Sequence, residues 1–142
     1  MPDFNYHLGK IQILSLFLSP EINRVNSDNL VLNYGINVDN RVSEQILEGK
    51  EFINSHVSIT ISYEKENLVI FEVSNIFNIE GLKNAVTTDD TGKHLIPIDI
   101  LDKVALVSIS VTRGLLFSNL RGTKLHNAIL PLVELNQEPE PL

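Results

Sequence analysis

The residues of this chain that are best suited to chemistry are its histidines, and they are scattered. His7, His56, His94 and His126 stand far apart in the sequence. A histidine binds metals and carries protons near neutral pH, but motifs that hold a metal place their ligands at short, regular spacings. One of the four could become a ligand through folding. Ordinary surface or hairpin histidines explain the pattern more simply, and we expect no metal site.

Three other groups resemble catalytic or phosphate-binding elements, and each has a simpler explanation. Residues 89–92, Asp-Asp-Thr-Gly, have the composition of a solvated turn, although the two carboxylates could also act as a pair. Residues 121–124, Arg-Gly-Thr-Lys, lack the longer glycine-rich frame of a phosphate-binding loop. The hydroxyl groups of Ser108, Ser110 and Thr112 have no nucleophile-elbow context. The sequence therefore predicts a protein that is not an enzyme and needs no cofactor.

The composition narrows the class of protein further. The chain has 142 residues, which is typical of one domain, and we treat residues 1–142 as a single domain. Its formal net charge of −7 argues against binding of nucleic acid, because neutralising phosphates requires lysine and arginine. The sequence contains no cysteine, which rules out disulfides and cysteine-based metal sites. This composition fits a reducing compartment, and we expect a cytoplasmic protein.

Residues 11–18 form an apolar run that admits two interpretations. The run has the length of the hydrophobic region of a secretion signal. However, Asp3 precedes it, Lys10 is the only lysine or arginine before it, and no small-residue cleavage site follows. We therefore favour a first β-strand over residues 8–18, which ends before Pro20. No run reaches the roughly 18 apolar residues of a membrane-spanning helix, so we expect no insertion into a membrane.

Alternating residues predict the rest of a sheet. In residues 29–38 every second residue is apolar, which indicates a half-buried strand, and residues 51–63 alternate in the same way. Residues 64–67 are a tight polar connection to the next apolar stretch, so the strands on either side of it should form an antiparallel hairpin. Between the strands at residues 29–38 and 51–63 we expect a helical turn around residues 43–47. The result is a four-stranded antiparallel sheet, which we predict to be a meander.

The last of these strands is the most unusual segment of the chain. Residues 68–81 read Leu-Val-Ile-Phe-Glu-Val-Ser-Asn-Ile-Phe-Asn-Ile-Glu-Gly, which we interpret as a strand that is apolar on both faces and runs into a bend. A sheet with two apolar faces needs cover on both sides, and a chain of this length has little material for that. The stretch predicts self-association or an apolar surface reserved for a partner.

A long helix is expected after a loop at residues 83–94. Pro97 suits the first turn of a helix, and the negative charges of Asp99 and Asp102 favour a helix N-terminus. Two apolar stripes follow at helical spacing as far as residue 116, although the β-branched run 104–111 leaves a strand as the alternative. The predicted fold class is therefore α+β, with a sheet packed against one long C-terminal helix.

Three short motifs resemble the protein-export chaperone SecB family. They are Phe-Glu-Val at 71–73, Ile-Phe-Asn-Ile-Glu-Gly at 76–81, and a helix that closes on Ser-Val-Thr-Arg-Gly at 110–114. The strand at 30–38 resembles the second strand of that family, and the resemblance spans roughly residues 8–120. It implies a SecB-like fold that assembles as a dimer of dimers, with long helices between two eight-stranded sheets. It also implies an ATP-independent holding chaperone for unfolded or pre-export polypeptides, with the preprotein translocation ATPase as a partner.

The chain departs from the family beyond the long helix. Where the family has a second helix, residues 128–135 are apolar but interrupted by Pro131, which indicates an extended segment, and residues 136–142 are expected to be a disordered tail. SecB-like chaperones also occur beside toxin–antitoxin pairs. The alternative function is therefore a dedicated partner-binding module on the same scaffold, for example one that holds an antitoxin. A small hydrolase or ligand-binding protein is the third possibility.

The resemblance and the apolar stretch together nominate the site residues. The predicted peptide-binding residues are Phe71, Ile76, Phe77 and Ile79. The predicted oligomer or partner interface consists of Phe71, Glu72, Val73, Ile100, Val104, Val107 and Val111. By resemblance, Glu72 corresponds to an acidic residue on the sheet face that the ATPase contacts, and Phe77 to the aromatic residue at the groove. Each apolar member could equally be an ordinary core residue.

Overall fold

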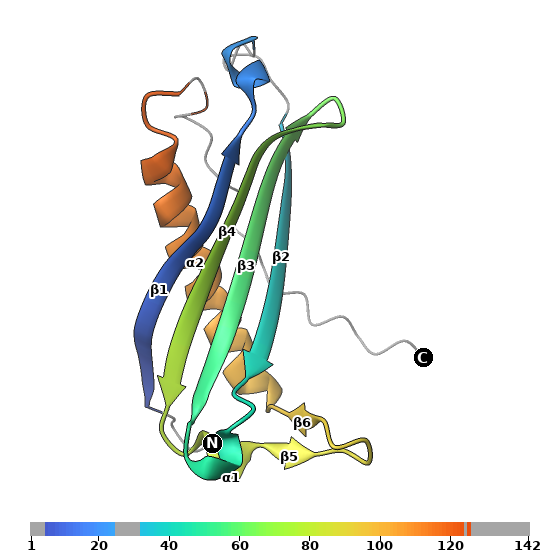
Figure 1. Cartoon of the computed structure of the whole chain (residues 1–142), viewed down its shortest axis with the longest axis vertical. Coiled ribbons are helices and arrows are strands. Elements are labelled where there is room, and N and C mark those ends of the chain that lie inside the picture. Colours follow the sequence, from blue (N-terminus) through green and yellow to red (C-terminus); the bar gives the residue numbers. More distant parts are fainter. Residues whose placement is uncertain (1–4, 25–31, 124, 126–142) are drawn as a thin grey trace.

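The alternating segments of the sequence form one antiparallel sheet, and the long C-terminal segment forms a helix across one of its faces (Figure 1). A computed structural model describes residues 5–24, 32–123 and 125. The main elements are β1 (Tyr6–Leu18), β2 (Asn33–Val42), β3 (Phe52–Tyr63), β4 (Glu66–Ile79) and α2 (Ile98–Asn119). The predicted fold class is confirmed, and the helical interpretation of the β-branched run is correct.

The strand order differs from a simple meander. The strands lie in the order β1-β4-β3-β2, so β2, β3 and β4 form a meander while β1 joins on the far side of β4. The register places Leu8 opposite Phe77 and Leu16 opposite Phe71. The prediction of a four-stranded meander is therefore wrong for β1. The period-2 pattern of a strand sets which residues share a face, but it does not determine the neighbouring strand.

The hairpin between β3 and β4 is tighter than predicted. Only Glu64 and Lys65 lie between the strands, and both have positive φ angles, 48° and 67°. Two successive residues of this kind are typical of a type I′ turn, whose twist matches that of the flanking strands. The hairpin itself is confirmed.

Two of the predicted boundaries are wrong. β4 does not bend at residue 76 but continues to Ile79, because residues 52–63 of β3 pair with it along its whole length. The chain turns only at Gly81, whose φ is 84°. Likewise α2 does not close at Gly114 but runs on to Asn119, because Leu116 and Leu120 are still buried against the sheet.

Short elements occupy the segments that were expected to be irregular. They are the 3₁₀ helices η1 (Pro20–Arg24) and η2 (Ile46–Glu48), the helix α1 (Leu82–Ala85), and the hairpin of β5 (Thr87–Thr88) and β6 (His94–Leu95). The predicted turn around residues 43–47 overlaps η2. The predicted turn at residues 89–92 is confirmed, since Asp89 accepts backbone N–H bonds from Thr91 and Lys93, each at 2.9 Å. The predictions for residues 128–135 and 136–142 lie outside the described residues.

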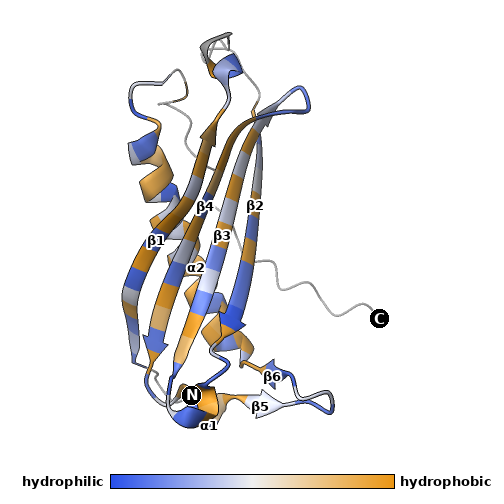
Figure 2. Ribbon diagram, viewed as in Figure 1, coloured by the Kyte–Doolittle hydropathy of each residue, from blue (hydrophilic) through white to orange (hydrophobic). Residues whose placement is uncertain are grey.

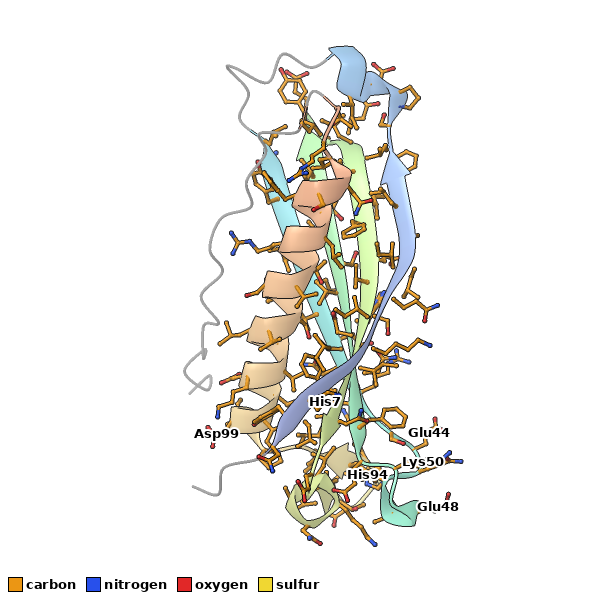
Figure 3. All side chains as sticks on the ribbon, turned by 90° about the vertical axis from the view of Figure 1, so that its left-hand side faces the viewer. His7, Glu44, Glu48, Lys50, His94 and Asp99 are labelled. Atoms are coloured by element: carbon orange, nitrogen blue, oxygen red, sulfur yellow. The ribbon has the colours of Figure 1, made fainter. Side chains whose placement is uncertain are left out.

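The core fills the layer between the sheet and α2, where side chains from both elements meet (Figure 3). It consists of two clusters. The upper cluster includes Val57, Ile59, Ile61, Val69, Phe71, Val73, Leu116 and Leu120. The lower cluster includes Ile46, Ile53, Phe77, Ile79, Leu82, Ile100 and Val104.

β4 is less evenly apolar than the sequence suggested. Its inner face carries Phe71, Val73, Phe77 and Ile79, all of which are buried. On the outer face only Ile70 and Ile76 are large and apolar, and they alternate with polar residues such as Glu72. The expectation of two apolar faces is therefore correct for the inner face and only partly correct for the outer face.

Candidate functional site

The predicted peptide-binding residues lie mostly inside the molecule. Phe71, Phe77 and Ile79 are at most 2% exposed and pack beneath α2, while Ile76 is half-buried on the outer face of the sheet. Within one chain these side chains belong to the core. Phe77 is the exception in one respect, because it also lines a hollow that opens at the surface.

The predicted interface residues also divide into buried and partly exposed ones. Four of them, Phe71, Val73, Ile100 and Val104, are buried. Val107 is 44% exposed, and Val111 is half-buried on the same helix. Glu72 is half-exposed and lies on the outer face of β4. Only the last three can meet another molecule without rearrangement.

The largest run of exposed apolar side chains lies on β1. Ile11, Ile13, Leu14 and Phe17 are each 45–49% exposed, and Figure 2 shows the hydrophobic colouring along the upper part of this strand. The pairing of β1 with β4 is irregular between Ile13 and Ser15, and such a bulge resets the alternation of side chains. As a result β1 presents apolar residues on both faces of the sheet.

A second exposed apolar region runs along the outward side of α2. Leu106, Val107 and Phe117 are 46%, 44% and 44% exposed. Ser110 and Gly114 lie between them and are also exposed. These positions repeat every three or four residues, so they share one side of the helix. We call Ile11, Ile13, Leu14, Phe17, Leu106, Val107 and Phe117 together the apolar surface.

A hollow of about 260 Å³ opens between the start of β1 and α2. It is lined by Tyr6, Phe77, Lys103, Leu106 and Val107. The ammonium group of Lys103 lies 5.3 Å from the centre of the Tyr6 ring, close enough for a cation–π contact. Burial, with a smaller contribution from the charge of Asp99, raises the pKa of Tyr6. The hollow therefore combines apolar walls with one cation, which suits an apolar side chain that carries a polar or negative end.

The outer face of the sheet has a different character. Ser15 donates a 2.9 Å hydrogen bond to the Glu72 carboxylate, and the His56 ring lies 3.8 Å from the other oxygen of that carboxylate. Beside them, Ser74 donates to Asn54 at 2.7 Å. Three strands thus hold Glu72 in a polar network that lies flat on the sheet.

No cluster of three metal-ligating side chains occurs among residues 5–24, 32–123 and 125. His7 comes from β1 and His94 from β6 (Figure 3), and His56 belongs to β3. His126 lies outside the described residues. A shallow hollow near the start of β1 contains Glu51 and Glu80, but these carboxylates accept hydrogen bonds from Lys83 N and Asn5 Nδ2.

The sequence reasoning missed the residues of β1 that form most of the apolar surface. A signal was present, because Leu14, Leu16, Phe17 and Leu18 place apolar residues at adjacent positions, more than one face of a half-buried strand can bury. It could not be assigned to the surface without knowing that β1 is an edge strand and that α2 packs mainly over β2, β3 and β4.

Comparison of the chain with protein-family models and with characterised proteins finds no match in either. Within the described residues, no helix has the length and apolar character needed to cross a membrane.

Proposed function

We propose that this protein is an ATP-independent holding chaperone of SecB type, which binds unfolded polypeptides through the apolar side chains of β1 and through Leu106 of α2. The observation that carries the proposal is the joint exposure of Ile11, Ile13, Leu14 and Phe17 on β1 and of Leu106 on α2. Monomeric soluble proteins seldom expose a contiguous apolar patch of more than a few hundred Å², and larger patches mark interaction sites.

An unfolded client would supply apolar side chains that cover the exposed apolar residues of this surface. β1 is an edge strand, and no described strand pairs with its outer edge. The apolar side chains of an extended peptide can pack against the exposed side chains of β1, and the burial of apolar area stabilises the complex. Binding of this kind depends little on the client's sequence, and it shifts the client's folding equilibrium because only the unfolded state is bound.

Self-association is part of the proposal. Gly114 sits inside α2, and apart from its chain neighbours and the adjacent helix backbone no atom lies within 4 Å of where its Cβ would be, so no contact within the described chain requires a glycine there. A glycine in a helix interior costs about 0.5–1 kcal/mol relative to alanine. Close approach of a second helix explains its presence, because small residues let helix backbones come near one another.

A two-fold axis near the middle of α2 would make this contact self-complementary. In an antiparallel crossing between Ser110 and Gly114, Val107 of one copy faces Phe117 of the other, so both copies bury the same apolar stripe. Pairing of the β1 edges would extend each sheet to eight strands. The two contacts together give the dimer of dimers that the resemblance implies, in the cytoplasm.

The alternative is a dedicated module that binds one partner, such as an antitoxin or the translocation ATPase. The observation that favours it is the network on the outer sheet face, where Ser15 and His56 flank the carboxylate of Glu72. A fixed polar arrangement of this kind discriminates between partners better than an apolar surface does, because a wrong partner leaves its groups unpaired.

The test is suppression of aggregation, followed by light scattering as a chemically unfolded client is diluted with or without the protein. Ile13→Glu and Leu106→Glu place charges in the apolar surface and should abolish suppression. The matched control is Leu47→Glu, since Leu47 is 66% exposed on η2 outside that surface, and it should leave suppression unchanged. Absence of suppression by the wild-type protein at stoichiometric ratio, for several clients, would refute the holding function.

A pull-down experiment tests the alternative, the dedicated partner-binding module. A single partner recovered by pull-down, lost in Glu72→Gln and unaffected by Leu106→Glu, would replace the general chaperone with the dedicated module. The molar mass in solution tests the assembly separately. A wild-type protein that stays monomeric at all concentrations would contradict the self-association of α2 and β1.

A further inference from the structure

The core is divided at one level by polar residues. On β3, Ser55 lies between Ile53 of the lower cluster and Val57 of the upper cluster. On β4, Asn75 lies between Val73 and Phe77 in the same way. Both Ser55 and Asn75 are completely buried, which is unusual for such residues.

The register of the sheet brings these residues into one row. Asn40 of β2 pairs with Ser55, Ser55 pairs with Asn75, and Asn75 pairs with Ile11 of β1. Ser108, also completely buried, lies on α2 between Val104 of the lower cluster and Leu116 of the upper cluster. We call Asn40, Ser55, Asn75 and Ser108 the polar seam.

The seam is short of hydrogen bonds. Asn75 Nδ2 donates to the Ser55 carbonyl oxygen at 3.3 Å. The side-chain oxygens of all four seam residues are buried, however, and none bonds to a described residue. A buried polar atom left unpaired costs roughly 1–3 kcal/mol, so these four atoms would together be a large cost unless another group pairs with them.

The hydroxyl group of Ser108 is unpaired among the described residues, although a local acceptor is within its reach. Two other hydroxyl residues of the same helix bond to the carbonyl four residues before them: Ser110 donates to Leu106 at 2.9 Å, and Thr112 donates to Ser108 at 2.7 Å. The Ser108 hydroxyl makes no such bond. Because its hydroxyl group does not donate to the carbonyl oxygen four residues before it, Ser108 can form hydrogen bonds with another group.

The seam also includes short side chains. Above and below it, the layer between sheet and helix is filled by side chains such as Phe71 and Phe77. The seam residues Ser55 and Ser108 have side chains that are among the shortest. A short side chain fills less of the layer than the large apolar side chains of the two clusters do.

We propose that the polar seam is a built hydration site, in which ordered water bridges the side-chain oxygens of Asn40, Ser55, Asn75 and Ser108. Water fits this chemistry because it can donate to the amide oxygens of the asparagines and both donate to and accept from the serine hydroxyls. Buried waters typically make about three hydrogen bonds to otherwise unpaired groups. The inference is independent of the proposed chaperone function.

Water can reach the seam from one end. The β1 member of the row is Ile11, which is 45% exposed, so α2 does not cover the sheet at that edge. Exchange through this edge requires only local motion and not unfolding. The bridging water should therefore be ordered on the nanosecond-to-microsecond scale and still exchange with solvent.

The test uses the full chain. Magnetic relaxation dispersion of water ¹⁷O detects long-lived internal water, and a crystal structure locates it. We expect ordered water within hydrogen-bond distance of at least two seam oxygens. Ser108→Val, which fills the space with an apolar group, should remove at least one long-lived water, whereas Ser110→Val on the exposed side of the same helix should remove none.

Two results would overturn the inference. One is a crystal structure in which the four side chains bond directly to one another with no water between them. The other is a relaxation signal that is the same in the wild-type protein and in Ser108→Val. If Ser108→Val does not fold, the wild-type crystal structure decides the matter by itself.

Discussion

Replacing Gly114 should affect the single chain and the assembly in opposite ways, which Gly114→Ala and Gly114→Leu test separately. The Cβ that Gly114→Ala adds would have no neighbour within 4 Å, so the substitution brings no clash within the described chain. It removes the entropic cost of a glycine inside a helix, which is about 0.5–1 kcal/mol. The free energy of unfolding of the dissociated chain should rise by that amount.

This magnitude is measurable. A gain of 0.5–1 kcal/mol raises the equilibrium constant for folding about two- to fivefold and the melting temperature by about 2–4 °C for a domain of this size. The assay is urea unfolding followed by circular dichroism, at protein concentrations where the chain is dissociated. Ser118→Ala, on the same exposed stretch of α2, is the control for a change of helix propensity without a glycine.

The second half of the prediction concerns the assembly. If a second helix crosses at Gly114, a larger side chain there must push the helices apart, so Gly114→Leu should weaken self-association while leaving the single chain folded. Sedimentation or light scattering over a concentration series measures this. A Gly114→Ala chain that is less stable than the wild type when dissociated, or a Gly114→Leu protein that associates as tightly as the wild type, would contradict a helix crossing at Gly114.

Three further predictions concern the fold. Phe71→Ala should lower the free energy of unfolding in urea by about 3–5 kcal/mol, because it opens a cavity in the core. A loss below about 1 kcal/mol would contradict the burial of Phe71 in the core. Lys65→Gly should raise the same free energy by about 0.5 kcal/mol, since it relieves a positive φ of 67°, and an unchanged urea midpoint would argue against the turn. Hydrogen bonds from the Thr91 side chain and from the backbone N–H groups of Lys93 and Thr91 lower the pKa of Asp89 below its ordinary 3.8. The ionised Asp89 therefore stabilises the folded turn at every pH above its ordinary pKa, and this stabilisation is lost as the pH falls through the lowered pKa. The amide NMR shifts of Thr91 and Lys93 should therefore titrate with a midpoint below 3.8, and Asp89→Ala should abolish the titration.

The sequence predicts the strands and the long helix well because their signals are local. Alternation over residues 51–63 follows from the pleat of a strand, and Pro97 with Asp99 marks the helix start because of the chemistry of an N-terminus. The boundaries are less well predicted. Gly114 breaks the local helical preference, yet α2 continues because burial of Leu116 and Leu120 outweighs it.

The site is predicted less well than the fold, for a physical reason. Whether an apolar residue such as Phe77 lies in the core or at the surface depends on what covers it, and that is a property of the tertiary arrangement. Phe71, Phe77 and Ile79 proved to be covered by α2, while the residues left uncovered are on β1, where the sequence indicated only a strand.

The sequence by itself determined the class of fold, the acidic and cysteine-free character of the chain, and the absence of a recognisable catalytic motif. The tertiary structure decided which strand is the edge, which side of α2 faces outward and which polar residues share a row. These features depend on pairing between segments that are distant along the chain. Asn40, Ser55 and Asn75 are unremarkable in the sequence and share one row only because of the register of three strands.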